Sequence, residues 1–176
     1  MSISQSLLPE FDQEMANTRK ILERVPEGRS DYKPHEKSMP LERLAAHVAE
    51  LPDWAKMTLT TERLDLSSAD FKPYLMTTRQ ELLDKFDKSV REARETIAAT
   101  PDEAFGVTWS LTFNGQPVFS MPRLAVYRTS FMNHIIHHRA QLGVYLRLND
   151  VEIPGMYGPS ADEMKFWDSK PQTQTA

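Results

Sequence analysis

The sequence predicts an all-α fold, a four-helix bundle with a short β-hairpin before the fourth helix. Four long segments repeat apolar residues at steps of three and four, the spacing of a helix with one buried face. Before the fourth segment, Asn114 and Gly115 separate two short runs of alternating apolar residues, which is the strongest local signal for a hairpin. The length of 176 residues predicts a single domain over 1–176, and 40% hydrophobic residues suffice for its core.

The first helix is predicted over residues 6–25. Pro26 and Gly28 end it, because neither residue favours continuation of a helix. The polar segment 27–37 that follows is a predicted loop, and its His35 is expected to face solvent. The predicted buried face of the helix consists of Phe11, Met15, Thr18, Leu22 and Val25.

The second helix is predicted to start near Ser38, with Pro40 in its first turn, where a missing N–H is tolerated. Pro52 lies inside the helical pattern and removes the hydrogen bond to the carbonyl of Val48. Either Pro52 ends the helix or it kinks the helix one turn beyond His47, and the pattern favours neither. The predicted buried face, which includes that histidine, consists of Leu41, Leu44, His47, Leu51 and Trp54.

A long polar connection over residues 60–76 leads to the third helix. Thr78 and Glu81 have the spacing of a capping box at its start, and Pro101 closes it. The predicted buried face consists of Leu82, Phe86, Val90, Ala93 and Ile97.

The hairpin is predicted from strands over 108–113 and 116–119. The Asn114–Gly115 pair between them favours a type I′ turn, in which both residues have positive φ. Pro117 places the second strand at an edge, because proline cannot donate to a ladder hydrogen bond.

The fourth helix is predicted over residues 120–150, with Ser120 as its N-cap. Two histidines, His134 and His138, stand four apart, so that their imidazoles project to the same side one turn from each other. His137 belongs to a mixed face and is expected to flank this site or face solvent. The predicted buried face consists of Leu124, Tyr127, Phe131, His134, His138, Leu142 and Tyr145.

Composition excludes several classes of function. The net charge is −4, and no Lys/Arg cluster suits a phosphate backbone, so nucleic acid is not an expected partner. The chain has no cysteine, which excludes disulfides and thiolate ligands and fits a reducing compartment. The N-terminus lacks the features of a secretory signal, and no apolar run approaches the roughly 18 residues of a membrane span. We therefore expect a cytoplasmic protein with no membrane partner.

Three histidines at positions expected to be buried, His47, His134 and His138, predict a divalent-metal site. A buried neutral imidazole costs roughly 1–3 kcal/mol unless its nitrogens find partners, and three such residues suggest a shared partner. Neutral imidazole binds zinc, nickel, copper or iron, and three histidines with an open fourth position are typical of catalytic metal. Ile135 stands where metalloprotease motifs place a glutamate, which argues against that mechanism. The alternative is that the histidines are hydrogen-bonded core residues.

Other residues near this pattern have weaker signals, and no catalytic acid or base is identified. Glu50, one turn beyond the first histidine, is able to approach the site, but a surface position is favoured. Tyr127 and Tyr145 share the histidine face and either donate to a ligand or only pack, and Trp54 either lines a pocket or packs. Arg139 is expected to point away from the buried face as a structural salt-bridge partner.

Two segments, LERLAAHVAELPDW around His47 and NHIIHHRAQLGVYLR over 133–147, resemble the DinB family, also called the DinB/YfiT-like metalloenzyme superfamily. The resemblance covers most of the chain, from the first helix through the IPGMYGPSADE segment. It implies a four-helix bundle of the DinB/YfiT-like type. It also implies a divalent metal ion (zinc, nickel or iron) held by His47, His134 and His138.

The resemblance further implies chemistry on small molecules. The superfamily includes thiol-dependent transferases and isomerases that use mycothiol, bacillithiol or glutathione, and metal-dependent hydrolases, and many members are dimers. The expectation is therefore a homodimeric hydrolase or thiol S-transferase, with a small-molecule substrate and a low-molecular-weight thiol as a candidate co-substrate. Two alternatives stay open: a non-catalytic bundle that binds metal or a small ligand, and a purely structural dimer module.

Overall fold

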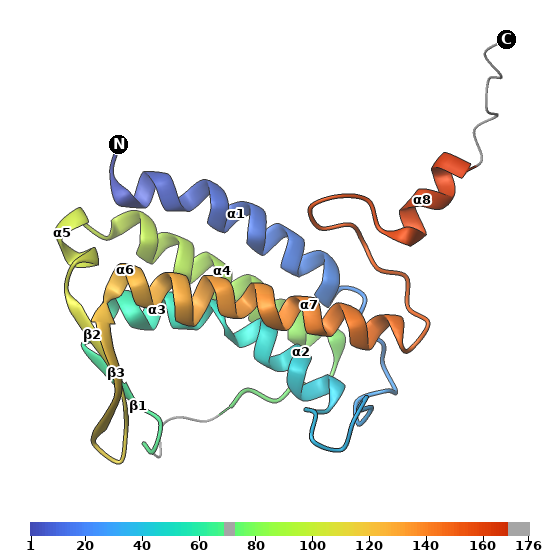
Figure 1. The fold of residues 1–176 in the computed structure, drawn as a ribbon, viewed down its shortest axis with the longest axis horizontal. Helices are drawn as coiled ribbons and strands as arrows, with labels where there is room; N and C mark the ends of the chain where they lie inside the picture. Colours follow the sequence, from blue (N-terminus) through green and yellow to red (C-terminus); the bar gives the residue numbers. More distant parts are fainter. Residues whose placement is uncertain (69–72, 169–176) are drawn as a thin grey trace, which may run out of the picture.

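The structure, a computed structural model, describes residues 1–68 and 73–168, with side chains up to residue 164. It is mostly helical, with a small three-stranded sheet at one end of the helices (Figure 1). The helices are α1 (Ile3–Leu22), α2 (Leu41–Glu50), α3 (Pro52–Thr60), α4 (Arg79–Ala99), α5 (Asp102–Phe105), α6 (Arg123–Val126), the π-helix η1 (Tyr127–Met132), α7 (Asn133–Arg147) and α8 (Ala161–Asp168). The strands are β1 (Arg63–Asp65), β2 (Thr108–Phe113) and β3 (Gln116–Pro122).

Helix α1 starts three residues earlier than predicted because Ser2 caps it. The Ser2 hydroxyl accepts the Gln5 N–H at 3.2 Å, and the Gln5 side chain accepts the Ser2 N–H at 2.9 Å. This reciprocal pair is a capping box, which satisfies two backbone donors that the helix itself leaves free. Each residue of the predicted face, through Val25 just beyond the helix, is buried.

Pro52 divides the second predicted helix into α2 and α3 without leaving helical backbone. Leu51 joins them with φ −58° and ψ −34°, in the right-handed helical region, and Pro52 occupies the first turn of α3. The Leu51 N–H still donates to His47 O at 3.2 Å. The two helices follow each other with a bend (Figure 1). Of the two alternatives for Pro52, a kink therefore fits this junction better than the end of a helix.

The long polar connection before α4 contains a strand, β1, that was not predicted. It pairs in parallel with β2. The sheet is thus larger than the predicted hairpin. Strands β2 and β3 pair antiparallel around Asn114 (φ 51°) and Gly115 (φ 73°), and β3 is an edge strand. Ser120 was predicted to cap a helix but lies in β3, where its hydroxyl meets that of Ser110 at 2.7 Å.

The fourth helical rod begins at Arg123 and contains a π-helical turn, η1, that the sequence pattern did not predict. A π turn has more residues than an α turn and therefore rotates the face that follows. From Met132 in η1 through α7, buried residues stand one position after the predicted His134 and His138, while Leu142 and Tyr145 are buried as predicted. The most deeply buried line therefore differs from the predicted one. It consists of Met132, Ile135, Arg139, Leu142 and Leu146.

The main core lies between α1, α2, α3, α4 and α7, and a smaller cluster around Trp109, Leu111 and Val126 joins the sheet to the helices. Arg139 is one of the few charged residues in the main core, with a relative exposure of 3%. It bridges α7 and α1 through Glu14, at 2.6 Å from Nη2 to Oε2. Among the described residues, no helix is long and apolar enough to cross a bilayer.

Candidate metal centre

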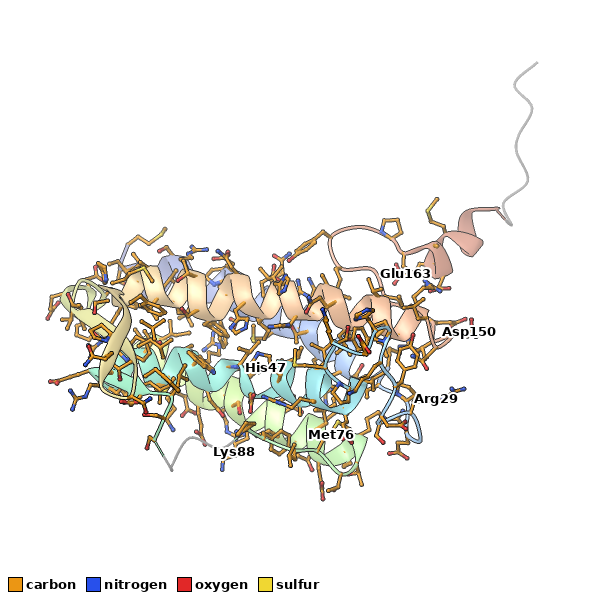
Figure 2. All side chains as sticks on the ribbon, turned by 60° about the horizontal axis from the view of Figure 1, so that its bottom comes forward. Arg29, His47, Met76, Lys88, Asp150 and Glu163 are labelled. Carbon is orange, nitrogen blue, oxygen red and sulfur yellow. The ribbon has the colours of Figure 1, made fainter. Side chains whose placement is uncertain are left out.

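The structure brings the three predicted histidines together. Their candidate ligand nitrogens all lie within 4.8 Å of one another, and the Nε2 atoms of His47 and His134 are 3.3 Å apart. Figure 2 shows His47 on the side of α2 that faces α7. His134 and His138 belong to α7. All three residues are half-buried, and the most deeply buried residues of α7 lie beside His134 and His138. The histidines therefore stand at the edge of the core rather than in its centre.

Each of the three histidines has an oxygen acceptor at Nδ1. An acceptor at this position favours the tautomer with the proton on Nδ1, which leaves the lone pair on Nε2. The acceptors are Glu50 Oε1 for His47 at 2.8 Å, the Ser130 carbonyl for His134 at 3.2 Å and Gln141 Oε1 for His138 at 2.8 Å.

This tautomer assignment fits a cation. With protons on all Nδ1 atoms, the Nε2 lone pairs of His47 and His134 face each other at 3.3 Å, an arrangement that two acceptors alone do not favour. A divalent ion among the Nε2 atoms removes that conflict, and oxygen acceptors behind metal-binding imidazoles are the usual second layer of such sites. The cluster can thus hold a metal ion.

Burial also favours the neutral form of two of these imidazoles, His134 and His138. It lowers the pKa of His138 to about 4, against the opposing hydrogen bond to Gln141 and with help from the neighbouring imidazoles. Burial likewise lowers the pKa of His134. Near neutral pH both rings are therefore unprotonated at Nε2, as metal binding requires.

Glu50 contacts His47 and is part of the site. The prediction that favoured a surface position for Glu50 was therefore wrong. Its side chain is 15% exposed, and its Oε1 also accepts from Arg43 Nη2 at 2.8 Å. Its Oε2 accepts the backbone N–H of Tyr74 at 2.7 Å. Burial raises the pKa of the Glu50 carboxyl, but the hydrogen bonds from His47, Arg43 and Tyr74 outweigh this, and the pKa lies below its usual value.

The aromatic candidates have separate roles. The ring of Trp54 stands edge-on to that of His134, with centroids 6.3 Å apart, so Trp54 lies beside the site. The Tyr145 hydroxyl donates to Met39 O at 3.1 Å. Tyr127 is fully buried, and burial raises its pKa well above the usual value.

The remaining polar candidates fall outside the site. His35 and His137 are exposed, as predicted. Arg139 was predicted to point away from the buried face and instead lies on it, although its predicted role as a salt-bridge partner is confirmed by Glu14.

Two of the oxygen acceptors carry a sequence signal, which was noted for Glu50 although a surface position was favoured, and which was missed for Gln141. Glu50 and Gln141 each stand three residues after a histidine, a spacing that brings side chains together on one helix face. The third acceptor, the Ser130 carbonyl, is a backbone group in η1 and has no side-chain signal.

Comparisons with known proteins agree with this architecture. The chain is similar to a DinB-like protein from Bacillus cereus, with 22% identity, a TM-score of 0.67, and coverage of 87% of this chain and 97% of the other. It is also similar to a DinB-like protein from Bacillus subtilis, with 21% identity, a TM-score of 0.66, and coverage of 86% and 97%. At these identities the likeness shows the fold alone. No curated protein matches. The model of the DinB family matches residues 1–174, and the chain therefore belongs to the DinB family.

Proposed function

We propose that this protein is a divalent-metal-dependent enzyme that acts on a small molecule, as a hydrolase or a thiol S-transferase. The observation that carries the proposal is the shared orientation of the three imidazoles. One candidate ligand nitrogen from each ring lies within 4.8 Å of the others, the Nε2 atoms of His47 and His134 are 3.3 Å apart, and each Nδ1 meets an oxygen acceptor. Three histidines leave room for a further ligand on a tetrahedral or larger coordination shell, which is typical of catalytic rather than structural metal.

A divalent ion bound there supplies Lewis acidity, which lowers the pKa of a water or a thiol and so produces a nucleophile near neutral pH. The chain's own residues orient the ligands. Glu50 accepts three hydrogen bonds and is therefore assigned to positioning rather than to proton transfer. Trp54 bounds one side of the site, and the half-buried position of the histidines gives small molecules access.

Zinc, nickel and iron all suit a site made only of imidazoles, and the proposal extends to any of the three. The four-helix bundle, the single domain, the homodimer and the cytoplasmic location stay predictions.

Metal binding is tested first, on untagged protein stripped with a chelator. We expect one zinc, nickel or iron ion per chain by elemental analysis and calorimetry, and loss of that ion in His47→Ala, His134→Ala and His138→Ala. His137→Ala is the matched control, because it also removes an imidazole from α7, next to His138 in sequence, but one whose ring is exposed. If wild type and His138→Ala bind equally little of each metal, the histidines are hydrogen-bonded core residues and the proposal fails.

Catalysis is tested separately on metal-loaded protein. Electrophile and ester panels are incubated with and without mycothiol, bacillithiol or glutathione, and turnover is compared with that of His47→Ala. Because the chain has no cysteine, thiol consumption reports only the added thiol. Turnover that requires a thiol assigns a transferase, and turnover without one assigns a hydrolase. Metal binding without turnover on any panel favours the non-catalytic binding bundle.

A further inference from the structure

Glu50 connects the three-histidine cluster to a segment of the chain that lies outside it. One carboxylate oxygen, Oε1, accepts from His47 Nδ1 and from Arg43 Nη2, both at 2.8 Å. The other, Oε2, accepts the backbone N–H of Tyr74 at 2.7 Å. The same carboxylate therefore serves a candidate metal ligand and the backbone of the segment 73–77.

Tyr74 fixes this segment against two helices. Its carbonyl accepts from Arg43 Nη1 at 3.4 Å, so that both of its backbone groups are held from α2. Its hydroxyl donates to Glu81 O at 3.2 Å, and the Lys85 ammonium lies 5.9 Å from its ring centroid. The half-buried ring also packs against the main core. Tyr74 thus joins α2 to α4, and the bond to Glu50 is the shortest of these contacts.

The tautomer of His47 sets whether its Nδ1 attracts or repels the Glu50 carboxylate. When a metal ion takes the Nε2 lone pair, Nδ1 must carry the proton and donate to Glu50. Without a metal ion, His47 has a second choice, in which Nε2 carries the proton and donates to His134 Nε2, 3.3 Å away. In that tautomer an Nδ1 lone pair faces a carboxylate oxygen, and the repulsion favours a different Glu50 rotamer.

We propose that Glu50 is a positioning residue that couples occupancy of the three-histidine cluster to docking of the segment 73–77 on α2. The inference rests on the metal site of the proposed function and adds a segment, 73–77, whose docking depends on that site. Since coupling between two sites is reciprocal, the factor by which metal stabilises the docked segment equals the factor by which docking strengthens metal binding.

Hydrogen exchange of the full-length protein tests this coupling, with zinc as the probe. Zinc is expected to slow amide exchange several-fold in peptides that span Tyr74–Thr77, because the Tyr74 N–H is held by Glu50 only when the carboxylate is fixed. In Glu50→Gln, zinc binds about 10–100-fold more weakly, as for other second-layer changes, and at saturating zinc this protection disappears. Glu92→Gln is the matched control, since Glu92 pairs with Lys56 rather than with a histidine or with a residue that contacts Tyr74, and it keeps the protection.

Reciprocity provides the second measurement. Tyr74→Ala removes the ring and hydroxyl contacts that dock the segment. It is expected to raise the zinc Kd by the same factor by which zinc slows amide exchange in the segment of wild type. If wild type binds zinc and exchange over 74–77 stays the same with and without it, the coupling is wrong and the metal site stands. If wild type binds no zinc, nickel or iron, the proposed function itself fails.

Discussion

At the scale of single residues, two neighbours on α7 face different partners. His138 faces α2 with its imidazole, while Arg139 enters the interface with α1. The Arg139 guanidinium donates to the Glu14 carbonyl at 3.0 Å, to Thr18 Oγ1 at 3.1 Å and to the Tyr157 hydroxyl at 2.6 Å. A buried charge with this many partners is costly to leave unpaired.

We expect Glu14→Ala to lower the free energy of unfolding by about 3–5 kcal/mol, because it leaves the Arg139 charge buried without its counter-ion. The double variant Glu14→Leu with Arg139→Met is expected to recover most of that loss. Urea unfolding of the metal-free protein measures both. The control is Glu10→Ala, which breaks the exposed pair with Arg128 and should cost about 0–1 kcal/mol. Equal losses for Glu10→Ala and Glu14→Ala would contradict the prediction.

Gln141 permits a similar test at the proposed metal site. Gln141→Ala removes the acceptor behind His138, so zinc affinity is expected to fall about 10-fold, the lower end of the usual range, because the exposed contact lets water replace it in part. Gln141→Glu keeps an oxygen at that position and should bind zinc at least as tightly as wild type. Competition with a chromophoric chelator gives the Kd values, and an unchanged Kd in Gln141→Ala would refute this role.

At the scale of elements, Asp65 attaches the hairpin turn to β1. Its carboxylate accepts the Gly115 N–H and the Ser67 N–H, each at 2.9 Å. The hydrogen bond from the Ser67 hydroxyl, with these two backbone bonds, lowers the pKa of Asp65 to about 2. Because these hydrogen bonds favour the ionised carboxylate, their contribution to stability depends on pH.

A folded-state pKa below the unfolded value of about 3.9 means that the unfolded chain binds more protons in this range. The stability from Asp65 is therefore complete above about pH 4 and is lost as the pH falls through about 2. We expect the difference in Tm between wild type and Asp65→Asn to be constant from pH 5 to 7 and to shrink below pH 4. A difference that stays constant down to pH 2 would exclude the ionised carboxylate as the cause.

Apolar spacing predicted most helices, because burial of one face dominates the choice of these residues. It did not predict β1, whose three residues are too few to show an alternating pattern. It also did not predict η1, because a π turn depends on how the rod packs rather than on a residue type. That turn explains why His134 and His138 were assigned to the centre of the buried face and lie at its edge. The histidine set itself was predictable, since spacing alone places the pair, whereas the Ser130 acceptor was not.

At the scale of the whole molecule, the three-histidine cluster joins α2 to α7 and so connects distant parts of the chain. A ligand that binds only the folded state stabilises it, by about 2.7 kcal/mol when its free concentration is 100 times the Kd. For a chain of this size that corresponds to a rise in Tm of about 5–10 °C.

We expect zinc at this excess to raise the Tm of wild type by that amount relative to protein in chelator, and to leave His47→Ala unchanged. Differential scanning fluorimetry measures the shift, with His137→Ala as a control that should follow wild type. An equal shift in His47→Ala would show that zinc stabilises the protein from another place.

The three oxygen acceptors behind the histidines also have a consequence for engineering. They come from a side chain of α2, a backbone carbonyl of η1 and a side chain of α7, and they differ in charge: carboxylate, peptide and amide. Because each contacts a different imidazole, the affinity and preference of the proposed metal site should be adjustable in separate steps without replacing a histidine. The Ser130 carbonyl is the exception, since no side-chain substitution removes it. The hydrogen bond behind His134 therefore stays the same in every variant of such a series.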